Sequence, residues 1–320
     1  ADRTQAELAI VLFGADEDAI RAAEALARAP KAMLLDMMQR VGSNLSGDAD
    51  RRMRRLVATA GLSRPIRSRL RSRSWRRRSQ GAALASLLTS NDPLRLRALD
   101  DPHPVVRART AEGLDALDVV EHVDRLIELI DDEVEAVRFA AQQALLRSDA
   151  RIVPALADYL RTSTSQGVVW ALEVAANLPD GRLRAPVERL LQSSDPQRRA
   201  IATEAMVPWL HDPAPLIELL ADPDAHVRAT AARAAGMATA ERLAARVGRM
   251  LSDSAWQVRR EAGLALAAMG PAGEMTLRIH LDDTDPYARD MAALVLDTIA
   301  ANATRSIFVS SPVEPEGVAA

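Results

Sequence analysis

Asp222-Pro-Asp-Ala-His-Val-Arg228 is the stretch that decides the fold, because the chain repeats its pattern at intervals of 29 to 31 residues. An Asp and an Arg lie six residues apart, small residues follow three and four positions after the Arg, and an apolar residue lies seven after it. A fixed period of this length is typical of repeat proteins, in which each repeat packs only on its neighbours. Further copies begin at Asp101, Asp132, Asp195 (a looser one), Asp253 and Asp283.

The repeated Asp and Arg predict a structural joint between repeats. The Asp lies at a turn entering a helix, where its carboxylate can accept backbone N–H groups that have no partner within the helix. The Arg can reach that Asp or the equivalent Asp one repeat away, with two parallel hydrogen bonds available. The pairs are too regular for a catalytic set. The residues of this predicted ladder are Asp101, Arg107, Asp132, Arg138, Arg199, Asp222, Arg228, Asp253, Arg259, Asp283 and Arg289.

The series is irregular in two places. The gap between Arg138 and Arg199 is two periods, so a degenerate copy is expected near 168–171; it has neither the Asp nor the Arg, and it carries Trp170 at the start of its helix. At the beginning, Arg77 lies thirty residues before Arg107 and fits the period. We therefore expect the helix pair at 64–88 to open the ladder.

The composition favours an all-α fold. Of 320 residues, 48% are hydrophobic but only 3% are aromatic, so Ala and Leu must fill the core. An apolar residue eight positions before each Arg closes the first helix of each pair, as in the predicted helix Val119–Ile130. The last second helix is expected to end near Ala301.

The repeated Asp-Pro-x-x-x-Val-Arg-x-x-Ala-Ala pattern resembles the HEAT-repeat family, in its bacterial form with short repeats like those of phycobilisome lyases. The resemblance covers roughly residues 64–301. It implies a right-handed α-solenoid of helix pairs whose second helices line the concave side. We expect a divergent N-terminal helical cap at 1–62, the solenoid at 63–302 and a flexible tail at 303–320.

No pattern in the sequence points to catalysis. The chain has no cysteine, which excludes disulfides, thiol catalysis and Cys-ligated zinc. Its five histidines lack the spacing of a metal site, and there is no Gly-rich phosphate loop or nucleophile motif. We predict a protein that is not an enzyme, with no metal, cofactor or small-molecule substrate.

Arginine is concentrated in residues 51–90, which contain twelve Arg and no Asp or Glu, whereas the whole chain has a net charge of -3. This segment predicts contact with phosphates of anionic lipid headgroups or of nucleic acid, unless it is a solvated face neutralised by acidic repeats. Its single aromatic residue, Trp75, and the acidic remainder of the chain disfavour nucleic acid. The candidate anion- or lipid-binding residues are Arg67, Arg71, Arg73, Arg76, Arg77 and Arg78.

Mixed charge on the predicted concave face favours a protein or peptide partner over a polyanion. Positions two and five after each ladder Arg are expected to be exposed there. Trp170 is either partly buried packing or a further anchor in the groove, because Trp and Arg dominate interface hot spots. The candidate partner-binding residues are Arg109, Glu112, Gln143, Trp170, Glu204, Arg233 and Glu261.

These observations predict an interaction scaffold that binds a protein along its concave face and docks to a second surface through the arginine-rich segment. The alternatives are a nucleic-acid-binding solenoid similar to HEAT-type DNA glycosylases and a protein similar to chromophore lyases. No apolar run of about 18 residues is present, so a cytoplasmic location is expected. The chain begins at Ala1 rather than Met, and an N-terminal anchor outside it would make the protein membrane-associated.

Overall fold

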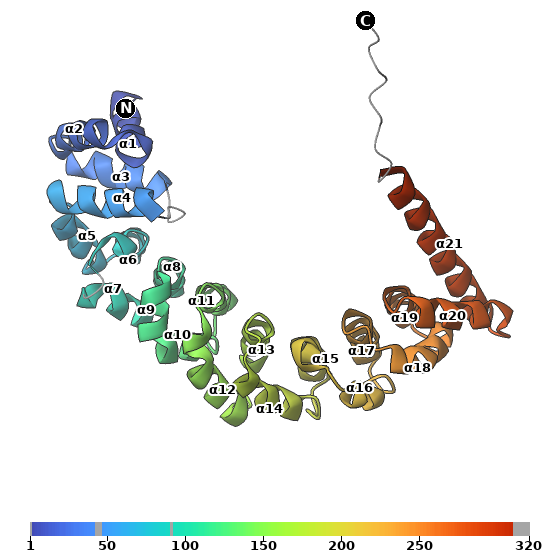
Figure 1. Cartoon of the computed structure of the whole chain (residues 1–320). Helices are drawn as coiled ribbons and strands as arrows, with labels where there is room; N and C mark the ends of the chain where they lie inside the picture. Colours follow the sequence, from blue (N-terminus) through green and yellow to red (C-terminus); the bar gives the residue numbers. More distant parts are fainter. Residues whose placement is uncertain (1, 42–46, 90–91, 310–320) are drawn as a thin grey trace, which may run out of the picture. The chain divides into compact units, whose positions relative to one another are not determined.

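The computed structural model describes residues 2–41, 47–89 and 92–309 (Figure 1). Within these ranges the regular structure is helical, with no strand, which confirms the predicted all-α class. No helix of the described residues is long and apolar enough to cross a bilayer. The chain forms two compact units, unit 1 (Ala1–Val174) and unit 2 (Ala175–Ala320). Their boundary falls within α13 (Val168–Ala176), the helix of the degenerate copy.

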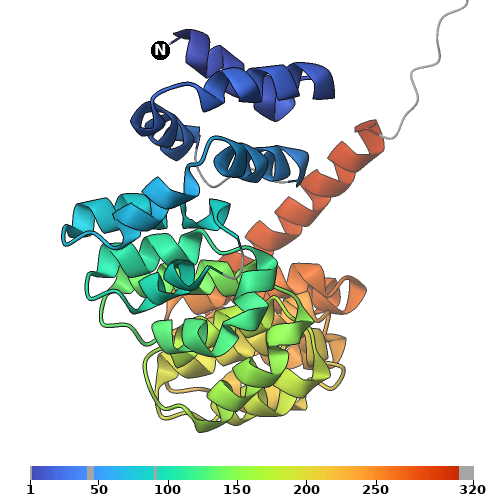
Figure 2. The same ribbon diagram turned by 90° about the vertical axis from the view of Figure 1, so that its left-hand side faces the viewer.

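Unit 1 begins with four helices that carry no ladder residue and lie at one end of the unit (Figure 2). Gly61, at φ 63°, ends the last of them in the left-handed conformation that glycine adopts without strain. The buried cluster here runs from Leu8 to Val106, so these helices share a core with the first repeats. A continuous core thus crosses the boundary predicted at 62/63. The helices are α1 (Asp2–Phe13), α2 (Asp16–Ala27), α3 (Lys31–Val41) and α4 (Gly47–Thr59).

The rest of unit 1 consists of helix pairs. The predicted single helix Val119–Ile130 is wrong, because the backbone leaves the helical region at His122 (φ −122°, ψ 27°) and divides it into α9 and α10. The pairs are α5 (Ser63–Leu70) with α6 (Trp75–Ala82), α7 (Pro93–Arg97) with α8 (Pro104–Glu112), α9 (Ala116–Glu121) and α10 (Val123–Leu129) with α11 (Glu135–Leu146), and α12 (Val153–Thr162) with α13.

Unit 2 continues the same pattern. Its last helix runs to Val309, beyond the predicted end near Ala301, because no Gly or Pro interrupts the chain before Pro312. The start of the predicted tail is therefore helical, and 310–320 lie outside the described residues. The pairs are α14 (Gly181–Leu190) with α15 (Pro196–Met206), α16 (Ala214–Leu219) with α17 (Ala225–Met237), α18 (Ala244–Arg249) with α19 (Trp256–Ala268), and α20 (Pro271–Ile279) with α21 (Pro286–Val309).

Short 3-10 turns flank several helices. They adjoin the N-terminal or C-terminal end of a helix, where the hydrogen bonding tightens for one turn. They are η1 (Ala85–Leu87), η2 (Ala98–Asp100), η3 (Ala150–Ile152), η4 (Val207–Trp209), η5 (Glu241–Leu243), η6 (Met250–Ser252) and η7 (His280–Asp282).

Small residues let the second helices of unit 2 approach closely. A Cβ atom on Gly236 in α17 would lie only 2.7 Å from Cα of Ala265 in α19. On the other side of α19, a Cβ atom on Gly263 would lie 2.9 Å from Cγ2 of Val295 in α21. The helices α15, α17, α19 and α21 consequently pack in series, side by side (Figure 1).

Candidate functional site

The ladder Arg of one repeat binds the ladder Asp of the next. In unit 2, Arg228 Nε and Nη2 donate to the two carboxylate oxygens of Asp253 at 2.8 and 2.9 Å. The third nitrogen, Nη1, donates to the backbone carbonyl of Asp222 in its own repeat at 2.8 Å. Arg199 makes the same two bonds to Asp222 at 2.7 and 2.8 Å. One guanidinium therefore holds two repeats together.

The first Arg–Asp pair of the ladder in unit 1 shifts the predicted ladder position by one residue, from Arg77 to Arg78. Arg78 donates to the carboxylate of Asp101 at 2.6 and 2.9 Å, and its Nη1 donates to the carbonyl of Ser72 at 3.1 Å. The predicted ladder residue, Arg77, is instead exposed. The repeat before Arg107 is twenty-nine residues long, and counting thirty residues back selected the wrong neighbour. Arg78, also a candidate anion ligand, is held in the ladder by its carboxylate partner.

Each ladder Asp also closes the turn before its second helix. Asp222 Oδ1 accepts the N–H of Asp224 at 2.9 Å. Asp224 is the residue that caps α17, accepting the N–H of His226 at 2.8 Å. In this repeat the capping role predicted for the ladder Asp thus belongs to the residue two positions later, whereas Val134 and Ala255 at the equivalent positions before α11 and α19 supply no side-chain cap.

Pairing lowers the pKa of three ladder carboxyls, those of Asp132, Asp222 and Asp253. Burial is the largest influence on Asp132 and raises its pKa, but hydrogen bonds from Arg107, at 2.7 and 2.8 Å, and from the N–H of Val134 outweigh it. The pKa values of Asp222 and Asp253 are lowered against burial in the same way. These carboxyls are therefore ionised and fully bonded at neutral pH.

Three ladder arginines have no carboxylate partner among the described residues. Arg138 donates to carbonyls of its own repeat, and its Nε is buried without a partner. Arg259 lies over the ring of Tyr287, with the guanidinium carbon 4.5 Å from the ring centroid. Arg289 in the last repeat bonds only backbone carbonyls of its own turn. The series of Arg–Asp pairs is thus interrupted after the third repeat of unit 1, and it does not extend to the last repeats of unit 2.

A different joint replaces the missing rung before α13. The hydroxyl of Tyr159 in α12 donates to Asp131 Oδ2 at 2.8 Å, and the N–H of Gly167 donates to Asp131 Oδ1 at 3.0 Å. A Cβ atom on Gly167 would collide with both side chains. The hydroxyl of Ser165 also bonds that of Tyr159, at 2.9 Å. The degenerate repeat is therefore joined to its neighbour by a carboxylate that follows the first helix of the preceding pair.

A buried ion pair joins α7 to α9 in unit 1. Arg95 and Asp118 are 0% and 1% exposed, and Arg95 Nη2 bonds the Asp118 carboxylate. Asp115 and Asp118 accept each other's N–H groups at 3.0 and 3.1 Å, and Arg54 reaches Asp115 at 3.3 Å. Burial is the main cause of the raised pKa of Asp118. This cluster joins α9 to α7 and, through Arg54, to α4.

The second-helix face of unit 1 carries the first group of predicted partner-binding residues. Arg109 and Glu112 are exposed on α8, and their charged groups lie 3.9 Å apart. Gln143 in α11 and Trp170 in α13 are half-buried. Because each keeps part of its side chain accessible, the row offers polar groups and one aromatic ring rather than a single charge.

The second-helix face of unit 2 carries the other group. Glu204 in α15 and Arg233 in α17 form an ion pair across the two helices. Glu261 in α19 is half-buried and pairs with Arg260 at 2.7 Å. The structure thus brings Glu204 and Arg233 together, whereas Glu261 pairs with a residue of its own helix.

Beside this ion pair lies an apolar ridge that the sequence analysis missed. Met237 in α17, Leu264 in α19 and Leu294 in α21 are 66%, 49% and 61% exposed. Each is adjacent in sequence to a residue at the close approaches of these helices, Gly236, Ala265 or Val295. Leu264 and Leu294 stand five positions after Arg259 and Arg289, so the same rule that selected Glu204 and Arg233 would have found them.

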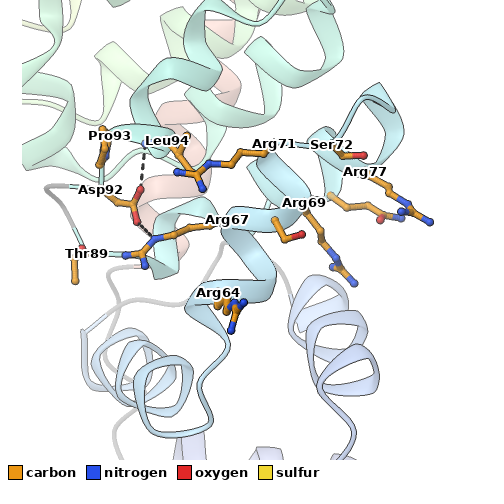
Figure 3. A pocket seen from close by; sticks show the side chains of 12 residues that line it. Arg64, Arg67, Arg69, Arg71, Ser72, Arg77, Thr89, Asp92, Pro93 and Leu94 are labelled. Atoms are coloured by element: carbon orange, nitrogen blue, oxygen red, sulfur yellow. Dashed lines mark hydrogen bonds and ion pairs between the residues drawn. The ribbon is translucent and has the colours of Figure 1, made fainter.

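An arginine cleft of about 1090 Å³ lies along α5, between it, α6 and the start of α7 (Figure 3). Arg67 donates to Asp92 at 2.5 Å within the cleft. Arg73 and Arg76, also predicted anion ligands, are exposed but do not line it. The lining residues are Arg64, Arg67, Ser68, Arg69, Arg71, Ser72, Arg77, Gln80, Thr89, Asp92, Pro93 and Leu94.

Metal-binding groups are not gathered anywhere in residues 2–41, 47–89 and 92–309, where no three His, Asp or Glu side chains are placed to hold an ion.

The comparison with models of protein families gives a clear match. The family model for HEAT repeats matches residues 91–177 and 183–267, which is more than half of the chain. The chain belongs to the HEAT-repeat family. No curated protein sequence matches it.

Solved structures resemble this HEAT-repeat protein in fold only. Kap121p bound to Ste12p aligns over 93% of this chain and 41% of the Kap121p chain, with 14% identity and a TM-score of 0.54. YibA of E. coli aligns over 85% of this chain and 97% of its own, with 14% identity and a TM-score of 0.46. An engineered protein aligns over 93% and 98%, with 18% identity and a TM-score of 0.43.

Proposed function

We propose that this HEAT-repeat protein is a non-enzymatic interaction scaffold that binds a segment of a partner protein on its second-helix face. HEAT and related solenoids use extended surfaces of this kind for binding. The observation that carries the proposal is the apolar ridge of Met237, Leu264 and Leu294 beside the Glu204–Arg233 ion pair.

The ridge supports a protein ligand because of its composition. Interfaces combine an apolar centre with a polar rim, and they are enriched in Met and Arg. Here three large apolar side chains on consecutive second helices stand next to one group of each charge. A partner segment with apolar side chains along one face and polar groups at one end would match this arrangement.

The row on unit 1, with Arg109, Glu112, Gln143 and Trp170, forms a second part of the proposal. It offers mixed polar contacts around one aromatic anchor, which suits a polypeptide better than a polyanion. The fold of Kap121p, which was crystallised with Ste12p bound, is compatible with protein ligands on such solenoids.

Site-specific photo-crosslinking in cells tests the proposal. A photoreactive amino acid is placed at Leu264 or Leu294, and the control position is Arg246 on the first helix α18, which is exposed. We expect the ridge positions to trap a discrete partner that the control position does not trap. Mass spectrometry identifies it, and it is then purified for binding measurements.

Titration calorimetry with the purified partner gives the decisive comparison. The double variant Leu264→Asp/Leu294→Asp should weaken binding by about tenfold or more, as expected for an interface centre. The matched double variant Arg242→Asp/Arg246→Asp on the exposed side of the first-helix row should bind normally. Equal losses in both variants, or crosslinks at Arg246 alone, would contradict the proposal.

A further inference from the structure

The arginine cleft contains more positive charge than its own carboxylates neutralise. Five arginines line it, and Asp92 is the single acidic residue among the lining side chains. Asp92 pairs with Arg67, and its other oxygen accepts the N–H of Leu94 at 3.1 Å, which caps α7. Arg64, Arg71 and Arg77 pair with no carboxylate among the described residues and are exposed to the cleft.

Arg69 is the most constrained of the five. Its Nη1 is buried and has no hydrogen-bond partner in the described part of the chain. Burial lowers the pKa of Arg69, Asp36 opposes that change, and the nearby positive charge of Arg77 lowers it further. Arg69 and Arg77 extend toward the same side of the cleft (Figure 3). A buried donor beside a second cation is stabilised when an anion binds both.

The remaining lining restricts the chemistry of the ligand. Ser68, Ser72 and Thr89 supply hydroxyl groups, and Gln80 supplies an amide. No aromatic residue lines the cleft, so nothing is placed to stack on a nucleobase. Only Pro93 and Leu94 are apolar, too few to bury an acyl chain. The volume of about 1090 Å³ lies just above the usual range of about 300 to 1,000 Å³ for small-molecule sites.

We propose that the arginine cleft binds a small ligand carrying two or more phosphate groups, with Arg69 and Arg77 holding one phosphate and Arg64 and Arg71 available for another. Guanidinium groups bind phosphate oxygens through two parallel hydrogen bonds, and several of them together discriminate a polyphosphate from a single anion. A phosphorylated metabolite and a phosphorylated lipid headgroup share this chemistry. The site is independent of the partner-binding face on the second helices.

Titration calorimetry with inorganic tripolyphosphate tests the site on the full chain, with sulfate as the comparison anion. We expect one binding event for tripolyphosphate and much weaker binding of sulfate. The double variant Arg69→Gln/Arg77→Gln should bind tripolyphosphate about tenfold more weakly or worse. If this variant is destabilised in thermal unfolding, Arg64→Gln/Arg77→Gln, which changes two exposed residues, should give the same loss.

A matched control separates a built site from general attraction to the arginine-rich segment. Arg73→Gln/Arg76→Gln removes the same charge a few residues away, from side chains that do not line the cleft. Its affinity should stay within about threefold of the unchanged protein, as expected for a screened long-range effect. Equal losses in the two double variants would overturn the proposal.

Asp92→Asn provides the opposite expectation. Asn keeps a side-chain oxygen to cap α7 but removes the negative charge and releases Arg67. Affinity for tripolyphosphate should therefore rise severalfold. An unchanged or lower affinity in a folded Asp92→Asn variant would contradict the assignment of the cleft.

Two further arms identify the source of the phosphate. Co-sedimentation with vesicles containing phosphatidic acid, lost in Arg69→Gln/Arg77→Gln, would assign a lipid headgroup; tripolyphosphate binding without co-sedimentation would assign a free metabolite. Tighter binding of a short single-stranded oligonucleotide than of tripolyphosphate, weakened equally by both double variants, would overturn the proposal in favour of nucleic acid.

Discussion

Arg228 in α17 and Asp253 before α19 are joined by two parallel hydrogen bonds, Nε to Oδ2 at 2.8 Å and Nη2 to Oδ1 at 2.9 Å. Both side chains are largely removed from solvent, at 17% and 13% exposed. Charge-assisted bonds in such surroundings contribute more than those of exposed ion pairs. The joint between repeats should therefore be measurable by mutation.

Arg228→Ala should lower the free energy of unfolding by about 2 kcal/mol, because it removes both bonds to Asp253 and the bond to the carbonyl of Asp222. The free energy of unfolding of Arg228→Lys should lie between those of Arg228→Ala and the unchanged protein, since an ammonium group cannot make the two-bond contact. Urea unfolding followed by circular dichroism measures both variants. Arg246→Ala on the exposed surface of α18 is the control and should change stability by less than about 0.5 kcal/mol. A similar loss in the control would argue against the joint.

Acid should weaken the ladder. The pKa values of Asp132, Asp222 and Asp253 are lowered in the folded state, so their contribution is fully present above the unfolded value of about 3.9. It is lost as the pH falls from that value through the lowered pKa values. Urea midpoints measured from neutral pH down to about pH 3 should drop at the acid end. Asp222→Asn/Asp253→Asn should be less stable at neutral pH and should show a flatter decline.

The buried pair of Arg95 and Asp118 should be costly to break and easier to replace. Arg95→Met leaves the carboxylate of Asp118 buried without its main partner, and the expected loss of stability is about 3 to 5 kcal/mol. Arg95→Met/Asp118→Leu removes both charges and should recover most of that loss. Thermal unfolding compares the two. A double variant no more stable than the single one would show that the charges themselves are needed.

Gly236→Ala should be destabilising although alanine is the better helix former. The new Cβ would lie 2.7 Å from the Ala265 backbone, so α17 and α19 must separate, at a cost of about 1 to 3 kcal/mol. Gly181 in α14 is the matched control, because a Cβ there meets no atom within 4 Å. Gly181→Ala should be neutral or stabilising by about 0.5 kcal/mol. Equal effects at the two positions would contradict the close approach.

Tyr159→Phe tests the joint of the degenerate repeat. It removes the hydroxyl that bonds Asp131 and Ser165, and it should cost about 1 to 2 kcal/mol. Tyr287→Phe is the natural comparison, since it keeps the ring under Arg259 and should change stability little. Chemical unfolding of both variants measures the difference. A loss at Tyr287 as large as that at Tyr159 would count against this joint.

The sequence and the structure agree best where the pattern is local. The turn, the small residues and the apolar residue of each copy recur at a fixed offset, so the helix pairs from α5 to α21 were predictable. The error of one residue at Arg77 arose because only three-dimensional contact shows which of several adjacent arginines reaches Asp101. The break at His122 was missed because neither Gly nor Pro marks it in the sequence.

The candidate sites were predictable in part. Offsets from the ladder Arg selected Glu204 and Arg233, which do meet, but polar residues were chosen and Leu264 and Leu294 at the same offset were passed over. The arginine-rich segment was evident from composition. Its division into cleft residues, exposed residues and the ladder residue Arg78 was not, because neighbouring positions on short helices point in different directions.

By itself, the sequence determined the period, the all-α class and the membership of a repeat family, because helix periodicity and turn chemistry are encoded within about 30 residues. Only the tertiary structure decided which Arg pairs with which Asp, since the carboxylate bound by Arg228 belongs to the next repeat and a backbone carbonyl to its own. It also decided that Asp131 and Tyr159 replace the rung at the degenerate copy. Long-range partners depend on how the helices stack, and the local pattern does not contain that information.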